Sequence, residues 1–192
     1  MNNFFDFEDD LEQCILTLSD GGVILYPTDT IWGLGCDATN DKAVRRIYEI
    51  KKRPTQNPFI VLVHSEAMLL KYVEDVPEIA FELIENAQHP LTLIFPKAKK
   101  ISPYVCAQDG SIAIRVVNEP FCKALISTFK KPIVSTSANI SGVPNPSIFS
   151  EITSEIKNSA DYVVQYRQSD TKQSKPSSII KILPDNSIKK IR

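Results

Sequence analysis

The stretch of residues 41–64, "DKAVRRIYEIKKRPTQNPFIVLVH", decides the fold class because it joins a helical pattern to a strand pattern. Its first half places Ala43, Ile47 and Ile50 on one stripe at the 100° spacing of an α-helix. Residues 59–63, "FIVLV", are rich in β-branched side chains and indicate a buried strand. The stretch therefore predicts one helix–strand unit of an α/β fold.

Helix and strand patterns alternate along the rest of the chain. Helices are expected at residues 7–22, 41–53, 65–72, 77–86, 119–129 and 150–159, and strands at residues 23–26, 59–63, 91–95, 111–116, 132–136, 161–166, 177–183 and 187–191. Thr39 or Asn40 is expected to cap the second helix. This alternation predicts an α/β fold with a twisted mixed β-sheet flanked by helices. Ligands of such sheets bind in the loops at the carboxyl ends of strands.

Length and composition are those of one ordinary folded domain. The 192 residues are 43% hydrophobic and 23% charged, which suits a single domain spanning residues 1–192. The sequence contains no run of 18 apolar residues, so no membrane helix is predicted. Its acidic N-terminus lacks the basic segment followed by an apolar segment that marks a signal peptide. We therefore expect a cytoplasmic protein without membrane contact.

Cysteine spacing and charge exclude further classes. Cys14, Cys36, Cys106 and Cys122 form no Cys-x-x-Cys pair, so inert reduced thiols are expected and a metal site is not. The formal net charge of -1 argues against a dedicated nucleic-acid-binding domain. Clusters of basic residues at 97–100 and 189–192 are interpreted as solvated surface.

Three consecutive cations end the 41–53 helix, and they are not equivalent. Lys51 follows Ile47 by four residues and falls within the apolar stripe, whereas Lys52 falls on the wet side. Arg53 precedes Pro54, which disfavours helical geometry and should turn the arginine away from the axis. The pattern fits a helix end decorated with cations that suit its dipole, and it fits a phosphate clamp of lysine and arginine.

Two loops are crowded with short polar side chains. "YPTDTIWGLGCDAT", residues 26–39, follows a strand, and its glycines allow a backbone to approach a ligand closely. Its nominal G-x-G-x-x-A lies too far from the strand and the helix for a dinucleotide fingerprint. "PIVSTSANISGVPNPS", residues 132–147, is either a cradle for a phosphate or nucleoside or a loop rich in turn formers.

Two further residues are candidates on weaker grounds. Arg115 lies inside the strand "SIAIRV", where an arginine either binds an anion or reaches the surface. His64 ends "FIVLVH" and is either structural or functional. The chain has no P-loop, no G-x-S-x-G and no H-E-x-x-H motif. The residues alone predict a cationic, hydroxyl-rich pocket for an anionic small molecule.

Four stretches together resemble the YrdC/TsaC family. They are "YPTDTIWGLGCDA", "IYEIKKRPTQNPFIVLV", "SIAIRV" and "STSANISG", in that order and spacing. The resemblance covers about residues 10–185 and implies a single YrdC-like domain of the short form. One departure is Val117, where the family usually has proline after "IRV".

The resemblance implies an activity. The family is a nucleotidyltransferase that makes L-threonylcarbamoyl-adenylate and pyrophosphate from L-threonine, bicarbonate or CO2, and ATP with Mg²⁺. Its product serves the threonylcarbamoyl modification of the adenosine beside the tRNA anticodon and passes to the tRNA threonylcarbamoyl transferase machinery. Weak tRNA binding by the chain itself stays open.

Site residues follow from the same resemblance. The catalytic signature falls on Lys51, Arg53, Ser137 and Asn139. Contacts to ATP are expected to add Asn57, Ser111 and Asn145, and contacts to threonine are expected at Thr28, His64, Arg115, Ser135 and Ser177. Magnesium is expected on ATP oxygens and water, with no protein-only ligand set.

The expected chemistry is positioning and charge stabilisation. A threonine carbamate would attack the α-phosphorus of ATP while Lys51 and Arg53 stabilise the phosphates. Rival interpretations are a carbamoyl-transfer module like that of hydrogenase-maturation proteins, an RNA-binding module, and the fold-related family that makes a riboflavin precursor.

Overall fold

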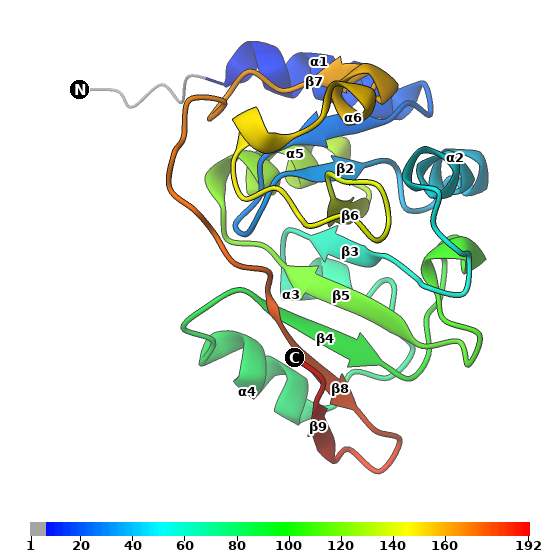
Figure 1. Ribbon diagram of the computed structural model, residues 1–192. Coiled ribbons are helices and arrows are strands. Elements are labelled where there is room, and N and C mark those ends of the chain that lie inside the picture. Colours follow the sequence, from blue (N-terminus) through cyan, green and yellow to red (C-terminus); the bar gives the residue numbers. More distant parts are fainter. Residues whose placement is uncertain (1–6) are drawn as a thin grey trace.

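The computed structural model describes residues 7–192 and is built on one mixed sheet of nine strands. The strand order is β7-β1-β2-β6-β3-β5-β4-β8-β9 (Figure 1). The strands are β1 (Ile24–Tyr26), β2 (Gly33–Gly35), β3 (Ile60–Val63), β4 (Leu91–Phe95), β5 (Ile112–Val116), β6 (Ile133–Ser137), β7 (Tyr162–Val163), β8 (Ser178–Ile182) and β9 (Ile188–Lys190). Three neighbouring pairs are parallel, β1–β7, β3–β5 and β4–β8, and the other five are antiparallel. The predicted α/β class and mixed sheet are confirmed.

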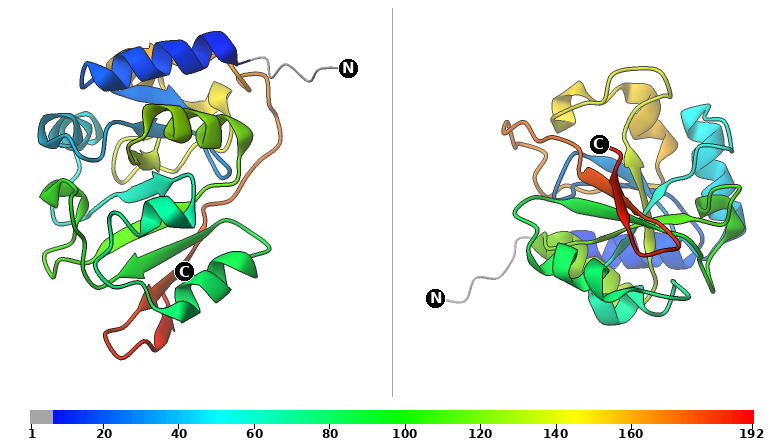
Figure 2. Two further views of the ribbon diagram at one scale, coloured as in Figure 1. Left: turned by 180° about the vertical axis from the view of Figure 1, so that it is seen from behind. Right: turned by 90° about the horizontal axis from the view of Figure 1, so that it is seen from below.

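Helices cover both faces of this sheet. They are α1 (Glu8–Ser19), α2 (Asp41–Lys51), α3 (Glu66–Leu69), α4 (Glu78–Glu85), α5 (Pro120–Phe129) and α6 (Ser154–Ser159). The views of Figure 2 place α1, α3, α4 and α5 on one face, and α2 and α6 on the other. The segment of residues 164–177 runs from the β7 end of the sheet to the β8 end (Figure 1). The chain between β7 and β8 thus reaches both halves of the molecule.

The α2 helix begins as predicted and ends two residues early. Asn40 caps it, because its side chain accepts hydrogen bonds from the backbone N–H groups of Lys42 and Ala43. The helix ends at Lys51 instead of Arg53, since Lys52 adopts the left-handed conformation with φ 49°. Lys51 is 1% exposed and Lys52 is solvated, so the predicted difference between the two lysines is confirmed.

Other boundaries differ more. The expected 150–159 helix is regular only from Ser154, and a 3-10 turn, Phe149–Glu151, precedes it. The expected 161–166 strand pairs only over Tyr162–Val163. A further 3-10 turn, Pro103–Val105, was not predicted.

Strand β2 was also missed, and its glycines explain why. The "GLG" of residues 33–35 has low strand propensity, yet it pairs with β1 and β6. A Cβ on Gly35 would lie 2.6 Å from Cε1 of Tyr26 and 2.8 Å from the carbonyl oxygen of Val134. The close approach expected at Gly35 is therefore to its own sheet and not to a ligand.

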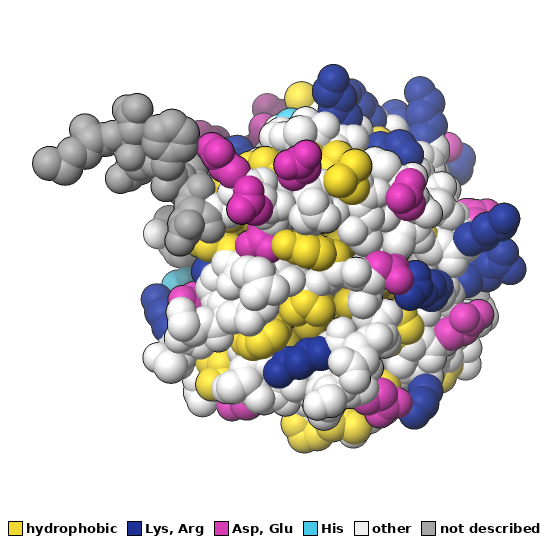
Figure 3. Space-filling model, turned by 90° about the horizontal axis from the view of Figure 1, so that it is seen from above, with side chains coloured by type: hydrophobic (Ala, Val, Ile, Leu, Met, Phe, Trp, Pro, Cys, Tyr) yellow, Lys and Arg dark blue, Asp and Glu magenta, His cyan; other side chains and the backbone are white. Residues whose placement is uncertain are grey.

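Two surface features can be described. No helix within residues 7–192 is long and apolar enough to cross a membrane. On the face that Figure 3 shows, basic and acidic side chains are interspersed. That face offers no single broad basic surface of the kind that nucleic-acid binding requires.

The packing of Gly35 generates a stability prediction. Gly35→Ala should lower the free energy of unfolding by about 1–3 kcal/mol, because Tyr26 and the β6 backbone must shift to admit the methyl group. Urea denaturation followed by circular dichroism measures this loss.

Gly110 supplies the control. It has φ +82° and nothing within 4 Å of an added Cβ, so Gly110→Asn should cost less than about 1 kcal/mol, because asparagine tolerates this conformation. Equal stability of the two variants would contradict the packing account.

Candidate functional site

One cavity of about 170 Å³ gathers half of the residues selected from the sequence. It opens where β2, β3, β5 and β6 meet the loop after α2 and the segment before β8. Six predicted residues line it: Arg53, Arg115, Ser135, Ser137, Asn145 and Ser177. They come from five separate stretches of the chain, which the sheet brings together.

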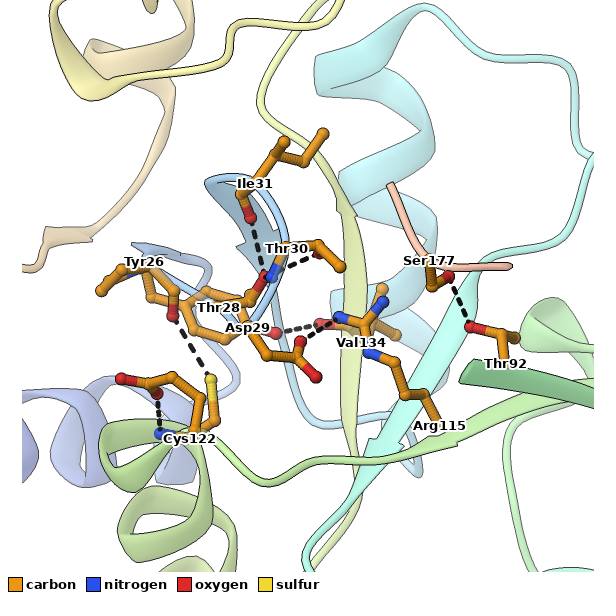
Figure 4. A network of polar contacts seen from close by, with 12 residues as sticks. Tyr26, Thr28, Asp29, Thr30, Ile31, Thr92, Arg115, Cys122, Val134 and Ser177 are labelled. Atoms are coloured by element: carbon orange, nitrogen blue, oxygen red, sulfur yellow. Dashed lines mark hydrogen bonds and ion pairs between the residues drawn. The ribbon is translucent and has the colours of Figure 1, made fainter. Parts of the chain in front are cut away.

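Strand register places two of these residues, Arg115 and Ser135. Leu62 of β3 pairs with Arg115 of β5, and Ile60 pairs with Ser135 of β6. Arg115 and Ser135 therefore approach from either side of β3. Arg115 is 2% exposed and extends toward the loop after β1 (Figure 4).

Arg115 carries an ion pair but unused hydrogen-bond capacity. Its Nη2 lies 3.0 Å from Oδ1 of Asp29. Neither Nε nor Nη2 makes a hydrogen bond within residues 7–192. A buried guanidinium with free donors is costly unless a ligand satisfies them. The arrangement suits a carboxylate or phosphate.

Thr28 supports this region from outside the cavity. Its hydroxyl donates to the carbonyl oxygen of Ile31 at 2.8 Å and accepts from the backbone N–H of Thr30 at 3.0 Å (Figure 4). Thr30, which was not selected from the sequence, lines the cavity instead. The structure therefore assigns Thr28 a bracing position and exposes Thr30 to a ligand.

Lys51 lies behind the cavity wall. Its ammonium donates to the carbonyl oxygens of Ser137 and Asn139, at 2.5 and 2.6 Å, and to Oδ1 of Asn139 at 3.2 Å. Its own carbonyl oxygen accepts from the backbone N–H of Ser141 at 2.9 Å. Lys51 thus joins the end of α2 to the loop after β6.

Two influences on Lys51 oppose each other. Burial, and then the nearby Arg53, lower the pKa of Lys51 to about 7. Its three oxygen acceptors favour the charged form, because only an ammonium can donate to all three. We therefore describe Lys51 as an ammonium in this arrangement.

Ser137 and Asn139 lie at the end of β6 and contact each other. The hydroxyl of Ser137 donates to Oδ1 of Asn139 at 2.5 Å. The side-chain Nδ2 of Asn139 donates to the carbonyl oxygen of Val143 at 2.5 Å. Asn139 is 8% exposed and does not line the cavity. It shapes the loop that carries Asn145, which does.

Arg53 is turned toward the cavity, as predicted. Its Nε donates to the carbonyl oxygen of Asn57 at 2.8 Å, and its guanidinium lies over the ring of Phe59. Burial lowers the pKa of Arg53. The amide side chain of Asn57 is exposed and does not line the cavity. Asn57 is thus linked to Arg53 through its backbone.

Two predicted residues lie elsewhere. The hydroxyl of Ser111 donates to Asp109 at 2.5 Å in the turn before β5. His64 lines a second, larger hollow of about 600 Å³, together with Asp29, Asn118 and Lys123. The first cavity and not this one carries the arginines and serines that converge from separate strands.

The structure adds residues that sequence patterns did not select. Arg192, interpreted as part of a solvated cluster, lines the cavity and donates from Nε to the carbonyl oxygen of Ser177 at 3.0 Å. The hydroxyl of Ser177 contacts that of Thr92 at 2.8 Å (Figure 4). Trp32 also lines the cavity and packs on Phe149, with ring centroids 4.8 Å apart. No local signal marks Arg192, because the pairing of β8 with β9 brings it there.

Chemically, the cavity suits a ligand with two anionic groups. Arg53, Arg115 and Arg192 surround it, and serine and threonine hydroxyls lie between them. Within residues 7–192, no group of three or more histidine, cysteine or acidic residues could hold a metal ion. Binding and orientation by cations and hydroxyls are what these side chains can supply.

Comparison with known proteins agrees with this geometry. The sequence model of the Sua5/YciO/YrdC family, described as "Telomere recombination", matches residues 17–192. A protein of Pseudoalteromonas translucida named threonylcarbamoyl-AMP synthase is 37% identical over 157 residues, which cover 80% of this chain and 84% of that protein.

Solved structures extend the likeness to the fold. The E. coli YciO structure has a TM-score of 0.82 and 26% identity, covering 96% of this chain and 88% of that one. The structure of P. abyssi Sua5 complexed with L-threonine has a TM-score of 0.82 and 27% identity, covering 96% of this chain. This chain spans only 54% of that Sua5 chain. With the family model covering most of its length, the chain belongs to the Sua5/YciO/YrdC family.

Proposed function

We propose that the chain is a threonylcarbamoyl-AMP synthase. It would make L-threonylcarbamoyl-adenylate and pyrophosphate from L-threonine, bicarbonate or CO2, and ATP. The observation that carries the proposal is the buried Arg115, which lines one cavity with Arg53 and Ser137. Relatives that bear this name support it, as does the threonine-bound state of a structural neighbour.

The amino acid is assigned to the Arg115 end of the cavity. The guanidinium of Arg115 lines this end and suits a carboxylate, with which arginine forms charge-assisted hydrogen bonds. Ser135 and Ser177 line the same cavity and can bond a hydroxyl or a carbamate. Thr28 braces the neighbouring loop. His64 remains a proposed threonine contact, which would require the ligand to reach the second hollow.

The nucleotide is assigned to the Arg53 end. Arg53 and Arg192 supply positive charge for the phosphates, and Ser137 and Asn145 supply polar contacts. Lys51 would contribute through its charge and by fixing the loop after β6. Asn139, Asn57 and Ser111 remain proposed for ATP binding, of which Asn139 and Asn57 contact site residues.

The reaction proceeds in two steps in this proposal. The neutral amine of threonine bonds to the carbon of CO2, one C–O double bond opens to an anionic oxygen, and the amine proton passes to water, which leaves a carbamate. A carbamate oxygen then bonds to the α-phosphorus of ATP. The bond between the α-phosphorus and the oxygen that bridges to the β-phosphorus breaks, and pyrophosphate leaves. The residues here orient the two substrates and stabilise the charge on the phosphates, which is the main task in phosphoryl-type transfer.

Magnesium enters this proposal as part of the ATP substrate. The cavity wall is cationic, and Asp29, a carboxylate next to it, already faces Arg115. Such a wall suits phosphates whose metal is held by their own oxygens and water. Cytoplasmic location, transfer of the product to the tRNA threonylcarbamoyl transferase machinery, and weak tRNA contact also belong to the proposal.

A direct assay tests the activity. The purified protein, mixed with ATP, Mg²⁺, labelled threonine and bicarbonate, should form a labelled adenylate and pyrophosphate. Product should disappear when either threonine or bicarbonate is omitted. Pyrophosphate release that is independent of threonine would contradict the proposal.

The contacts of Lys51 generate a second prediction. Lys51→Ala should lower kcat/KM roughly 30- to 1000-fold, equivalent to roughly 2–4 kcal/mol, because the variant loses a cation near the phosphates and loosens the loop of Ser137 and Asn139. Steady-state kinetics of adenylate formation measure this loss.

The neighbouring lysine is the matched control. Lys52 pairs only with the exposed Glu155 among the described residues, and its own side chain is 67% exposed. Lys52→Ala should leave kcat/KM within about twofold of wild type. Equal losses in the two variants would show that the position of Lys51 carries no special role.

A further inference from the structure

Asp29 and Arg115 form a buried ion pair beside the cavity. Nη2 of Arg115 lies 3.0 Å from Oδ1 of Asp29, and the two side chains are 3% and 13% exposed. Within residues 7–192, Arg115 makes no other ion pair. Removing one partner of such a pair leaves an uncompensated buried charge. The conformation of the Arg115 guanidinium therefore depends on Asp29.

The pair is not completed by hydrogen bonds. Oδ1 of Asp29 and both Nε and Nη2 of Arg115 lack a hydrogen-bond partner among the described residues. A pair serving stability alone is expected to satisfy its remaining donors, because unused ones cost free energy in a buried place. The pair therefore lacks the full set of bonds that a purely structural ion pair makes, and Arg115 lines the cavity where a ligand would bind.

The carboxylate of Asp29 is held by a braced loop. Thr28, which precedes Asp29, forms hydrogen bonds with Thr30 and Ile31, which follow it. Nη1 of Arg167 donates to the carbonyl oxygen of Thr28 at 3.1 Å. Asp29 thus has little freedom to follow a moving arginine. It can act as a fixed point against which the guanidinium is oriented.

Asp29 also lies on the far side of Arg115 from the ligand. Arg115 lines the site cavity, whereas Asp29 lines the second hollow and not the site cavity. Figure 4 shows the carboxylate of Asp29 directed at the guanidinium. A ligand confined to the site cavity therefore meets Arg115 and not Asp29.

We propose that Asp29 is a positioning residue that pairs with Nη2 of Arg115 and thereby holds its guanidinium against the site cavity for the carboxylate of the amino-acid substrate. The inference rests on the proposed function and specifies how one of its residues is oriented. Burial raises the pKa of the Asp29 carboxyl, and Arg115 counteracts that rise. Arg115 therefore favours the charged form of Asp29, and Asp29 fixes the orientation of the guanidinium.

Asp29→Asn tests the proposal, since it removes the charge and keeps the size. KM for threonine, measured at saturating ATP and bicarbonate, should rise about ten- to a hundredfold. KM for ATP should stay within about threefold, because Arg53 and its neighbours are unchanged. A lower or unchanged KM for threonine would overturn the proposal, as would a fall in kcat alone, which indicates a proton-transfer role.

A second pair of variants repeats the charge test at another size. Asp29→Glu and Asp29→Gln differ only in charge, so the glutamine variant should show the higher KM for threonine. This comparison carries the test if Asp29→Asn does not fold. Equal KM values for the two variants would count against the proposal.

Two controls separate positioning from stability. Asp10 is a buried aspartate that bonds the hydroxyl of Tyr162 and the backbone N–H groups of Gln165 and Tyr166. Asp10→Asn should lower the melting temperature and leave KM for threonine unchanged below it. In an Arg115→Lys background, Asp29→Asn should raise KM for threonine much less than in wild type, because the two residues act as a unit.

The outcomes also separate this inference from the proposed function. An active wild-type chain with an unaffected Asp29→Asn variant overturns the positioning role alone. A wild-type chain that forms no threonine-dependent adenylate overturns the proposed function, and the inference with it.

Discussion

The buried ammonium of Lys51 is the interaction on which the site depends. It joins the end of α2 to two backbone carbonyl groups at the end of β6, which lie 86 and 88 residues away in sequence. The backbone N–H of Ser141 completes the link by donating to the carbonyl oxygen of Lys51. Without this link, the position of Arg53 after the helix would not be fixed relative to Ser137 at the strand end. The buried Lys51 thus fixes the end of α2 against the loop after β6, which forms one wall of the cavity.

Around that wall the charges are arranged for a ligand and not for stability. Arg115 is buried with one counter-charge and free donors, and burial lowers the pKa of both Lys51 and Arg53. Strained electrostatics of this kind typically mark functional sites. A carboxylate bound at one end of the cavity and a polyphosphate bound at the other would neutralise these buried cations. In the proposed function, the fold pre-organises charge that the substrates would neutralise.

Local patterns predicted much of this arrangement, and long-range pairing accounts for what they missed. Helical angle alone separates Lys51 from Lys52. Short polar residues limit the cap to Thr39 or Asn40, and the structure shows that Asn40 is the cap. Strand β2 was not predicted, because its Gly-Leu-Gly has low strand propensity. Its close contact with Tyr26 and Val134 cannot be read from local sequence. Arg192 and Asp29 escaped because strand pairing and a cross-loop ion pair bring them to the site. The resemblance selected residues such as His64 and Ser111, which the structure leaves outside the cavity.

A crystal structure of the chain with threonine and a non-hydrolysable ATP analogue tests the account most directly. The account predicts the threonine carboxylate on the guanidinium of Arg115 and the phosphates beside Arg53. Lys51 should still be bonded to the Ser137 and Asn139 carbonyl groups. Threonine bound wholly in the second hollow beside His64, with the donors of Arg115 still free, would contradict it.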